Sequence, residues 1–404
     1  MLNEIDKKAE VSLFSCVDEG LRLLRWTVRR WSFRHCWYRM RLPFRRRRWM
    51  TRNILAAQRI PEKRPVAWTA GPAIAFGEFS GSSGLGRGAG YDLEQIKKHH
   101  EIVIAVDVSE ALKGRPTPID VPHKIENAYF LCQPDTYWVI PELVAPQTFE
   151  NAYRIGRWAW ETPYFPDSWR FSERLLHEVW ASSEFCATTF RSALAIPVKV
   201  SPYPVPQPTA TSLDMRSRLS IKKDAFLGVA VMDIFSCPDR KNPWAHVKAW
   251  KKAFGDDPDC VLVMKLRVSR RTRLVVNELM ELAGAGNNVR FLLDELTEEE
   301  IAGLHRSADV YMSLHRSEGF GLNIMEALLL DKPVIATHYS ANTEFGPSFP
   351  NYIGISYSLK DYDDWLAHYD KSFQYADPDL DEAAARLREV CGSRLFRGRL
   401  HSQM

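Results

Sequence analysis

Residues 317–328 read SEGFGLNIMEAL and carry two glutamates, Glu318 and Glu326, eight positions apart. The preceding stretch, 308–313, predicts a short strand, and the apolar run 322–330 predicts a buried helix because it contains no glycine or proline. A Gly-Phe-Gly turn lies between them. Such a turn leaves backbone N–H groups free at the positive end of the helix dipole. We therefore expect this turn to suit phosphate or sugar oxygens.

The second glutamate of this stretch is unusual because its neighbours on the predicted helix are mostly leucines. Leu322, Leu329 and Leu330 lie three or four positions from Glu326. A carboxylate in apolar surroundings is costly unless it has a partner, and a ribose diol would be suitable. Taken alone, the spacing favours the simpler interpretation, in which Glu318 is a loop residue and Glu326 a satisfied core carboxylate.

Size and composition indicate an ordinary globular protein. The 404 residues are enough for two domains, and 45% are hydrophobic and 26% charged. The seven cysteines are scattered without a C-x-x-C pair, which argues against a disulfide framework or a zinc site and favours a reducing compartment. No apolar run reaches 18 residues, so we expect no spanning helix and a cytoplasmic location.

Charge is distributed very unevenly along the chain. Residues 21–52 hold twelve arginines and no lysine or acid, so the rest of the chain carries a formal net charge of −8. Tryptophans are interleaved with these arginines, as in a peripheral anchor on an anionic membrane surface. An inert tail and a nucleic-acid contact are the alternatives, and we expect no nucleic-acid partner.

The first half of the chain shows the alternating pattern of a Rossmann-like unit. A strand at 72–76, six glycines within 77–90, a helix at 91–100 and a strand at 102–106 follow one another. The backbone amides of residues 82–86, with Gly84 and Gly86, are candidates to approach a diphosphate or an acceptor. A flexible loop is the competing interpretation.

Further along, the pattern completes this first unit and then predicts a second unit of the same type. In the first unit we expect a strand at 153–161 and a helix at 169–180, followed by a proline-rich interdomain linker at 201–208. From residue 225 the series continues with strands at 226–232, 260–266, 289–293 and 333–337, and helices at 243–254, 274–283 and from Thr297 onward. The predicted organisation is a basic extension (1–65), two Rossmann-like domains (66–208 and 209–375) and a C-terminal tail (376–404) that we expect to be truncated.

Polar residues gather where strands of the second unit end. Arg240 and Lys241 follow its first strand, and Lys265 ends the next. Ligands of parallel sheets lie at the carboxyl ends of the strands, so these cations and the two glutamates predict a nucleotide-sugar pocket. Taken alone, Arg240 and Lys241 would more simply be a solvated surface pair.

Several segments together resemble glycosyltransferase family 4, whose members are retaining enzymes with two Rossmann-like domains, the GT-B fold. The similar segments read SLHRSEGFGL at 313–322, KPVIAT at 332–337, RIGRWAWETPYFPDSW at 154–169, EVWASSEF at 178–185 and DRKNP at 239–243. The resemblance covers most of residues 70–390. It implies an α/β protein of GT-B fold with an Arg/Trp-rich N-terminal extension.

The resemblance also implies roles for individual residues. Glu326 would hold the ribose, Glu318 would face the hydroxyls of the donor sugar, and Lys241 would bind phosphate. Amides of Phe320, Gly321 and Leu322 would assist. The family's arginine five residues before the lysine is replaced by Ser236, so Arg240 or Lys265 would substitute. The usual histidine of the first domain is also absent, and Trp160 and Glu161 stand in its region; Glu161 is the candidate to position the acceptor or donor.

The implied activity is transfer of a sugar from a nucleotide diphosphate sugar to an acceptor hydroxyl, with retention and without a metal or other cofactor. The expected partners are the donor, a saccharide or lipid-linked saccharide acceptor in polysaccharide or glycolipid assembly, and the inner face of the cytoplasmic membrane. A nucleotide-sugar epimerase or a non-catalytic binding protein on this fold are the alternatives. At the chain end, a helix at 382–390 is expected to dissolve over 391–397.

Overall fold

The computed structural model describes residues 50–51, 53–81, 83–121, 124–208, 210–269, 272–362, 369 and 373–402, with side chains up to residue 393. The arginine-rich segment 21–52 therefore lies outside the described residues, apart from Met50 and Thr51. No helix in the described ranges is long and apolar enough to cross a membrane.

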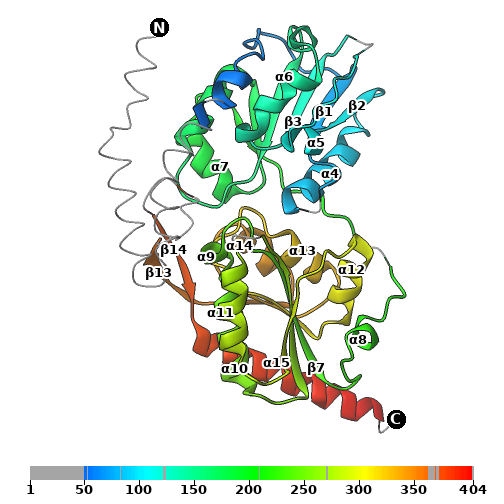
Figure 1. Ribbon diagram of the computed structural model, residues 1–404, viewed down its shortest axis with the longest axis vertical. Helices are drawn as coiled ribbons and strands as arrows, with labels where there is room; N and C mark the ends of the chain where they lie inside the picture. The colour runs from blue at the N-terminus through cyan, green and yellow to red at the C-terminus, as the bar shows by residue number, and fades with distance from the viewer. Residues whose placement is uncertain are drawn as a thin grey trace.

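The first domain is built on a parallel sheet of six strands (Figure 1). Their order is β2-β1-β3-β4-β5-β6, with bounds β1 Ala73–Gly77, β2 Val103–Asp107, β3 Asn127–Leu131, β4 Tyr153–Trp158, β5 Glu178–Ala181 and β6 Val198–Val200. The helices of this domain are α4 Gly84–Ile96, α5 Ser109–Leu112, α6 Ile140–Leu143 and α7 Glu184–Arg191, with 3-10 turns η1 Pro134–Val139, η2 Pro146–Phe149 and η3 Asp167–Arg174. Ala57 and Ile60, within the predicted extension, also pack into the core of this domain.

The second domain repeats the arrangement with the strand order β12-β11-β10-β7-β8-β9, again parallel throughout. The strands are β7 Phe226–Asp233, β8 Cys260–Arg267, β9 Val289–Leu292, β10 Val310–Ser313, β11 Val334–Thr337 and β12 Tyr352–Ile355. The helices are α8 Met215–Arg218, α9 Pro238–Lys241, α10 Pro243–Phe254, α11 Arg273–Ala283, α12 Glu298–Ser307, α13 Leu322–Leu329, α14 Asn342–Phe345 with the 3-10 turn η4 Gly346–Ser348, and α15 Leu380–Ser402. A small antiparallel pair, β13 Tyr357–Asp361 and β14 Gln374–Pro378, follows the main sheet.

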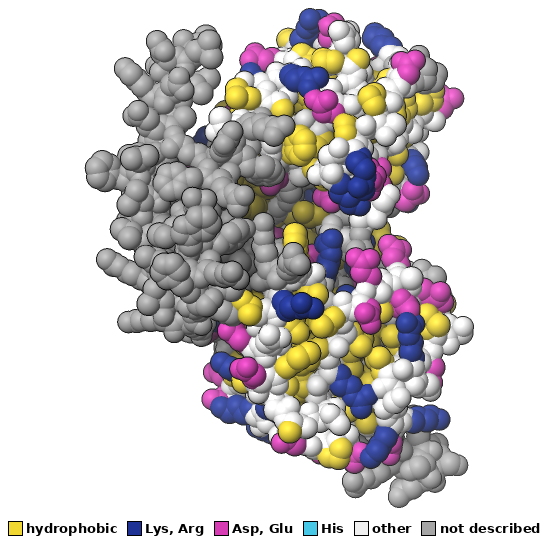
Figure 2. Space-filling model, in the orientation of Figure 1, with side chains coloured by type: hydrophobic (Ala, Val, Ile, Leu, Met, Phe, Trp, Pro, Cys, Tyr) yellow, Lys and Arg dark blue, Asp and Glu magenta, His cyan; other side chains and the backbone are white. Residues whose placement is uncertain are grey.

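The two sheets confirm the predicted architecture of two Rossmann-like domains. Buried aliphatic and aromatic side chains cover both faces of each sheet, as expected for parallel strands. In Figure 1, α4 lies at the edge of the first domain that faces α12 and α13 of the second. The carboxyl ends of the β7 and β10 strands open toward this interdomain space, where Lys and Arg side chains lie around a hollow (Figure 2).

Three local predictions were wrong. The glycine-rich stretch was expected to be a loop before a helix at 91–100, but α4 already begins at Gly84, because the Ser83 side chain caps it by accepting from the Gly86 amide (3.0 Å). The helix expected at 169–180 is instead the 3-10 turn η3 followed by strand β5, which pairs with β4 and β6 inside the sheet.

The third error concerns the chain end. The helix expected to dissolve after residue 390 continues as α15 to Ser402. It packs along α10 on the side of the second domain away from the first (Figure 1), and Ala383, Ala384 and Leu387 are fully buried there. Val390 and Cys391, where the sequence predicted the helix to end, pack against the same core, and tertiary contact of this kind stabilises a helix beyond its own propensity.

Candidate active site

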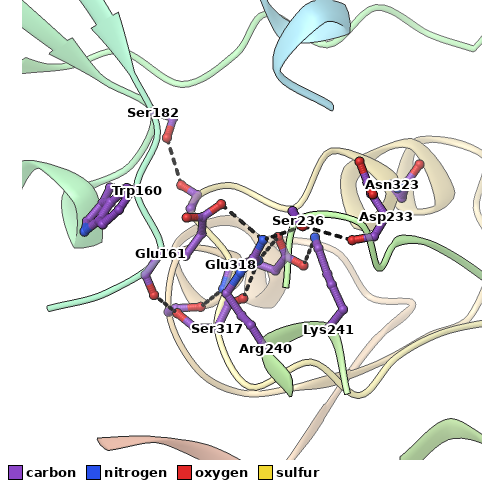
Figure 3. Close-up of polar contacts among 12 residues, drawn as sticks. Trp160, Glu161, Ser182, Asp233, Ser236, Arg240, Lys241, Ser317, Glu318 and Asn323 are labelled. Carbon is purple, nitrogen blue, oxygen red and sulfur yellow. Dashed lines mark hydrogen bonds and ion pairs between the residues drawn. The ribbon is translucent and has the colours of Figure 1, made fainter. Parts of the chain in front are cut away.

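A buried cluster of one carboxylate and two cations lies at the carboxyl edge of the second sheet (Figure 3). The Lys241 ammonium lies 2.6 Å from Glu318 Oε1, and Arg240 Nη1 lies 3.4 Å from Glu318 Oε2. Burial by itself raises the pKa of Glu318, but the charges of Lys241 and Arg240 outweigh it and lower that pKa to about 2. Glu318 is therefore ionised at neutral pH, and two positive groups already point into the cleft.

Local backbone geometry explains why both cations reach the same point. The short helix α9 begins with Pro238 and ends at Asn242, whose φ of +50° is the left-handed conformation that asparagine tolerates. The Asn242 side chain donates to the Leu314 carbonyl (3.1 Å), which ties the end of α9 to the residue after β10. This tether places Arg240 and Lys241 beside the loop that carries Glu318.

The helix that follows Glu318 presents its N-terminus to the cleft. Gly321 precedes α13 with a φ of +94°, a conformation that other residues adopt only with strain. The amides of Leu322, Asn323 and Ile324 belong to the first turn, where no intrahelical acceptor exists. The Phe320 side chain is buried against Tyr203 and Phe345, so the contribution that we expected from Phe320 is limited to its backbone.

On the opposite side, helix α4 faces the cluster with its own N-terminus. Ser83, Gly84 and Leu85 line the same cavity as Lys241 and Glu318, and its volume is about 180 Å³. Of the two predicted glycines, Gly84 lies at this cavity, whereas Gly86 packs against the Glu78 and Gly81 carbonyls, where a Cβ atom would come within 2.6 Å. Gly86 therefore shapes the start of α4 without lining the cleft.

The Glu326 carboxylate already has ion-pair and hydrogen-bond partners within the protein. Its carboxylate forms an ion pair with Arg87 of α4 and accepts a hydrogen bond from the Tyr91 hydroxyl (3.2 Å). The neutral His305 ring lies 3.9 Å away. The interpretation of Glu326 as a satisfied buried carboxylate therefore describes this structure, and the ribose contact stays a prediction.

Glu161 and Ser236 both meet Arg240. Glu161 Oε1 lies 3.2 Å from Arg240 Nη2, and the Glu161 carbonyl accepts from the Ser317 hydroxyl (2.5 Å). Ser236 accepts a hydrogen bond from Arg240 (3.4 Å) at the position where relatives were expected to carry arginine. Of the two residues proposed to replace that arginine, Arg240 is the one that contacts Glu318.

The other proposed substitute, Lys265, lies elsewhere in the cleft. It lines a neighbouring cavity of about 120 Å³ together with Arg267 and Glu295. Burial lowers its pKa, partly offset by the nearby Asp233 and Glu295 carboxylates. This cavity shares Ser83, Gly84 and Asn323 with the first, so the two are neighbouring parts of one groove.

Sequence reasoning missed the residues that join the two domains around this site. Ser182 and Ser183, just before α7, donate to the Gly319 carbonyl at 2.8 and 2.9 Å, and the Cys186 thiol does so at 3.2 Å. Glu344 of α14 accepts from the Glu184 and Phe185 amides at the start of α7, both at 2.8 Å. The turn between the two glutamates is therefore clamped to the first domain. Within the described ranges, no group of three His, Cys, Asp or Glu side chains is arranged to hold a metal ion.

Comparison with known proteins agrees with this geometry. Residues 238–346 match the family model described as "Glycosyl transferases group 1", a segment that contains Arg240, Lys241, Glu318 and Glu326. No curated protein matches the sequence.

Solved structures share the fold at low sequence identity. A glycosyltransferase from Rickettsia africae is 15% identical, with a TM-score of 0.55 over 80% of this chain and 89% of that one. WaaG, a glycosyltransferase involved in lipopolysaccharide biosynthesis, is 13% identical, with a TM-score of 0.52 over 79% and 90%. HepE of Anabaena, in complex with UDP and glucose, is 15% identical, with a TM-score of 0.50 over 68% and 82%. The family match and the shared architecture together support a glycosyltransferase of GT-B fold.

Proposed function

We propose that this protein is a retaining, metal-independent glycosyltransferase of the family 4 type. Its donor would be a nucleotide diphosphate sugar, and its acceptor a hydroxyl of a saccharide or lipid-linked saccharide in polysaccharide or glycolipid assembly. The observation that carries the proposal is the cluster of Lys241, Arg240 and Glu318 beside the N-terminus of α13. It lies inside the segment that matches the group 1 model.

The cluster suits a departing diphosphate. Lys241, Arg240 and the first amides of α13 supply positive charge that is fixed before the reaction, and such preorganised charge stabilises developing negative charge most effectively. Glu318 forms ion pairs with both cations in this structure. When a donor binds, the diphosphate would take over these cations and the Glu318 carboxylate would accept hydrogen bonds from sugar hydroxyls.

The proposed chemistry is a substitution at the anomeric carbon on a single face of the sugar. The bond between C1 and the β-phosphate oxygen breaks, and a bond between C1 and the acceptor oxygen forms on the same face. The hydroxyl proton passes to the departing phosphate oxygen, so the products are the glycoside and the nucleoside diphosphate. Glu161, which forms an ion pair with Arg240, would orient the acceptor hydroxyl in this proposal.

Ribose binding by Glu326 requires a rearrangement. In this structure Arg87 occupies the carboxylate, so a nucleotide would have to displace it. The freed guanidinium lies at the end of α4 that faces the cleft, where the diphosphate would provide a new partner. The proposed location is the cytoplasmic face of the membrane, with residues 21–52 as the contact.

Release of nucleotide from a panel of donors tests the proposal, starting with UDP sugars because HepE was crystallised with UDP and glucose. We expect turnover with retained anomeric configuration that persists in EDTA. Lys241→Met should lower kcat about 100-fold or more, as expected when one group that stabilises transition-state charge is removed. Lys248→Met, an exposed lysine on α10, is the matched control and should retain activity. Undiminished turnover in Lys241→Met would refute the assignment.

A further inference from the structure

Arg316 lies two residues before Glu318, but its side chain does not line the donor cleft. It reaches instead toward the β13–β14 hairpin, which lies outside the main sheet of the second domain (Figure 1). The side chain is only 12% exposed. A charged group so deeply buried is costly unless its donors are satisfied, so the partners of this arginine indicate what it does.

On one side, Arg316 binds the end of helix α9 at two consecutive carbonyls. Its backbone amide donates to the Arg240 carbonyl (2.8 Å), and its Nη1 donates to the Asp239 carbonyl (3.0 Å). Carbonyls in the last turn of a helix have no intrahelical donor and carry partial negative charge, so a cation is favourable there. Arg316 therefore caps the C-terminus of the short helix that carries Arg240 and Lys241.

On the other side, strand β14 holds the same guanidinium. Its Nε and Nη2 lie 2.9 and 2.7 Å from Asp377 Oδ1. Its central carbon lies 4.9 Å from the centroid of the Tyr375 ring, a cation–π distance. The Arg316 carbonyl also accepts a hydrogen bond from the Ala376 amide (3.1 Å). Three consecutive residues of the hairpin thus fix Arg316, and all three lie outside the segment 238–346 that matches the family model.

We propose that Arg316 is a positioning residue, which acts through α9 to hold Arg240 and Lys241 where the donor diphosphate departs, with the β13–β14 hairpin as its anchor. The inference rests on the proposed function, because it takes these two cations as the groups that stabilise the leaving diphosphate. Arg316 itself would touch neither the donor nor the acceptor. Fixed charge stabilises a transition state most when it needs no reorganisation during the reaction. A loosely held α9 would therefore slow the chemical step more than it would weaken donor binding.

Steady-state kinetics of the full chain test this, with the donor that shows the highest turnover in a panel of UDP sugars. Arg316→Met should lower kcat about tenfold and change the donor KM by less than about threefold, because displacing a catalytic group by about 1 Å can cost about 100-fold in rate. Arg316→Lys keeps the positive charge and should recover part of this loss. Arg386→Met, which removes an exposed arginine from α15, is the matched control and should leave both constants unchanged.

A double variant separates positioning from a general structural effect. If Arg316 acts through the cations of α9, Arg316→Met should cost less than about threefold in a Lys241→Met background, because residues that act as a unit have non-additive effects. A site that is merely destabilised would lose the same factor in both backgrounds. Equal factors, an unchanged kcat in Arg316→Met, or a loss confined to KM would each overturn the proposal. All rates are measured well below the melting temperatures of the variants.

Hydrogen exchange distinguishes failure of this inference from failure of the proposed function, because it requires no turnover. The Lys241 amide donates to the Cys237 carbonyl at 3.1 Å. The Asn242 amide donates to the Pro238 carbonyl at 2.7 Å. In Arg316→Met both amides should exchange about tenfold faster or more, as expected when a charge-assisted hydrogen bond is lost, while the amides of α11 keep their rates. Unchanged exchange on α9 would overturn the positioning role, whereas absence of turnover by the unmutated protein with every donor would count against the proposed function.

Discussion

At the residue scale, the most consequential contact is the ion pair between Arg87 and Glu326. The two side chains are 13% and 9% exposed and belong to different domains. Removing one partner leaves the other charge largely buried without compensation, so Arg87→Met should lower the free energy of unfolding by about 3 kcal/mol. The double variant Arg87→Met/Glu326→Gln should recover most of this loss. Urea unfolding of the four proteins measures the coupling, and additive losses would contradict it.

Buried histidines make a second prediction at this scale. His246 donates from Nδ1 to the Asn242 carbonyl and accepts the Leu314 amide at Nε2, and burial lowers its pKa to about 4. Burial likewise lowers the pKa of His315 to about 4. Between about pH 6.5 and 4, these two histidines are protonated in the unfolded chain but remain neutral in the folded protein.

Stability should therefore fall as the pH is lowered from 7 to 5, by up to about 1.4 kcal/mol per pH unit for each histidine. Glu318 acts in a lower window, between its unfolded pKa and about 2, so it does not contribute to this fall. Urea midpoints at pH 7, 6 and 5 provide the measurement. A His246→Gln variant should show a shallower slope, and equal slopes would argue against a neutral buried ring.

At the scale of elements, helix α4 contains two glycines, Gly88 and Gly90, whose surroundings differ. A Cβ atom on Gly88 would lie 2.6 Å from the Tyr203 ring, whereas one on Gly90 would meet nothing within 4 Å. Gly90→Ala should raise the free energy of unfolding by about 0.5–1 kcal/mol, because alanine favours the helix. Gly88→Ala should lower it by about 1–3 kcal/mol through overpacking. Thermal unfolding of both variants checks the difference, and shifts of equal sign would show that α4 is packed differently.

Elements with clear apolar patterns could be predicted from the sequence, and those governed by contacts could not. Helix α10 has the bounds expected from its starting proline, and the capping box at Thr297 and Glu300 opens α12. The β5 strand was missed because its polar Glu178 is buried, where Tyr153, Trp180 and Lys199 satisfy it. The predicted helix at the chain end was shorter than α15 because Gly392 is a poor helix former and because the sequence does not show the contact with α10.

At the scale of the whole molecule, Glu344 is a test of how the domains are joined. Its carboxylate accepts both amides at the start of α7 across the interface. In Glu344→Ala these charge-assisted hydrogen bonds are lost, which should weaken the contact by about 1–3 kcal/mol. Hydrogen exchange at Glu184 and Phe185 should accelerate, while an exposed change on α11, Glu281→Ala, should not alter it. Unchanged protection would mean that Glu344 does not hold the interface.

The same scale explains which parts of the site escaped prediction. Arg240, Lys241 and Glu318 could be predicted from the sequence because they follow strands of one domain, and ligands of a parallel sheet bind at the carboxyl ends of its strands. Arg87 meets Glu326 across 239 positions, and Ser182 meets Gly319 across 137. No spacing rule in one sequence joins residues so far apart, so the contacts between domains required the structure.

The Gly319 carbonyl, held by two hydroxyls and a thiol of the opposite domain, sits next to the carboxylate that grips both cations. Gly319 also lies so close to the Trp160 backbone that an added methyl would come within 3.1 Å of it. A shift of this peptide would therefore directly change both the contacts with the first domain and the position of the Glu318 carboxylate. If donor binding repositions Glu318, the hydrogen bonds that join the two domains at Gly319 change at the same time. Donor binding and the relative movement of the domains would then be coupled.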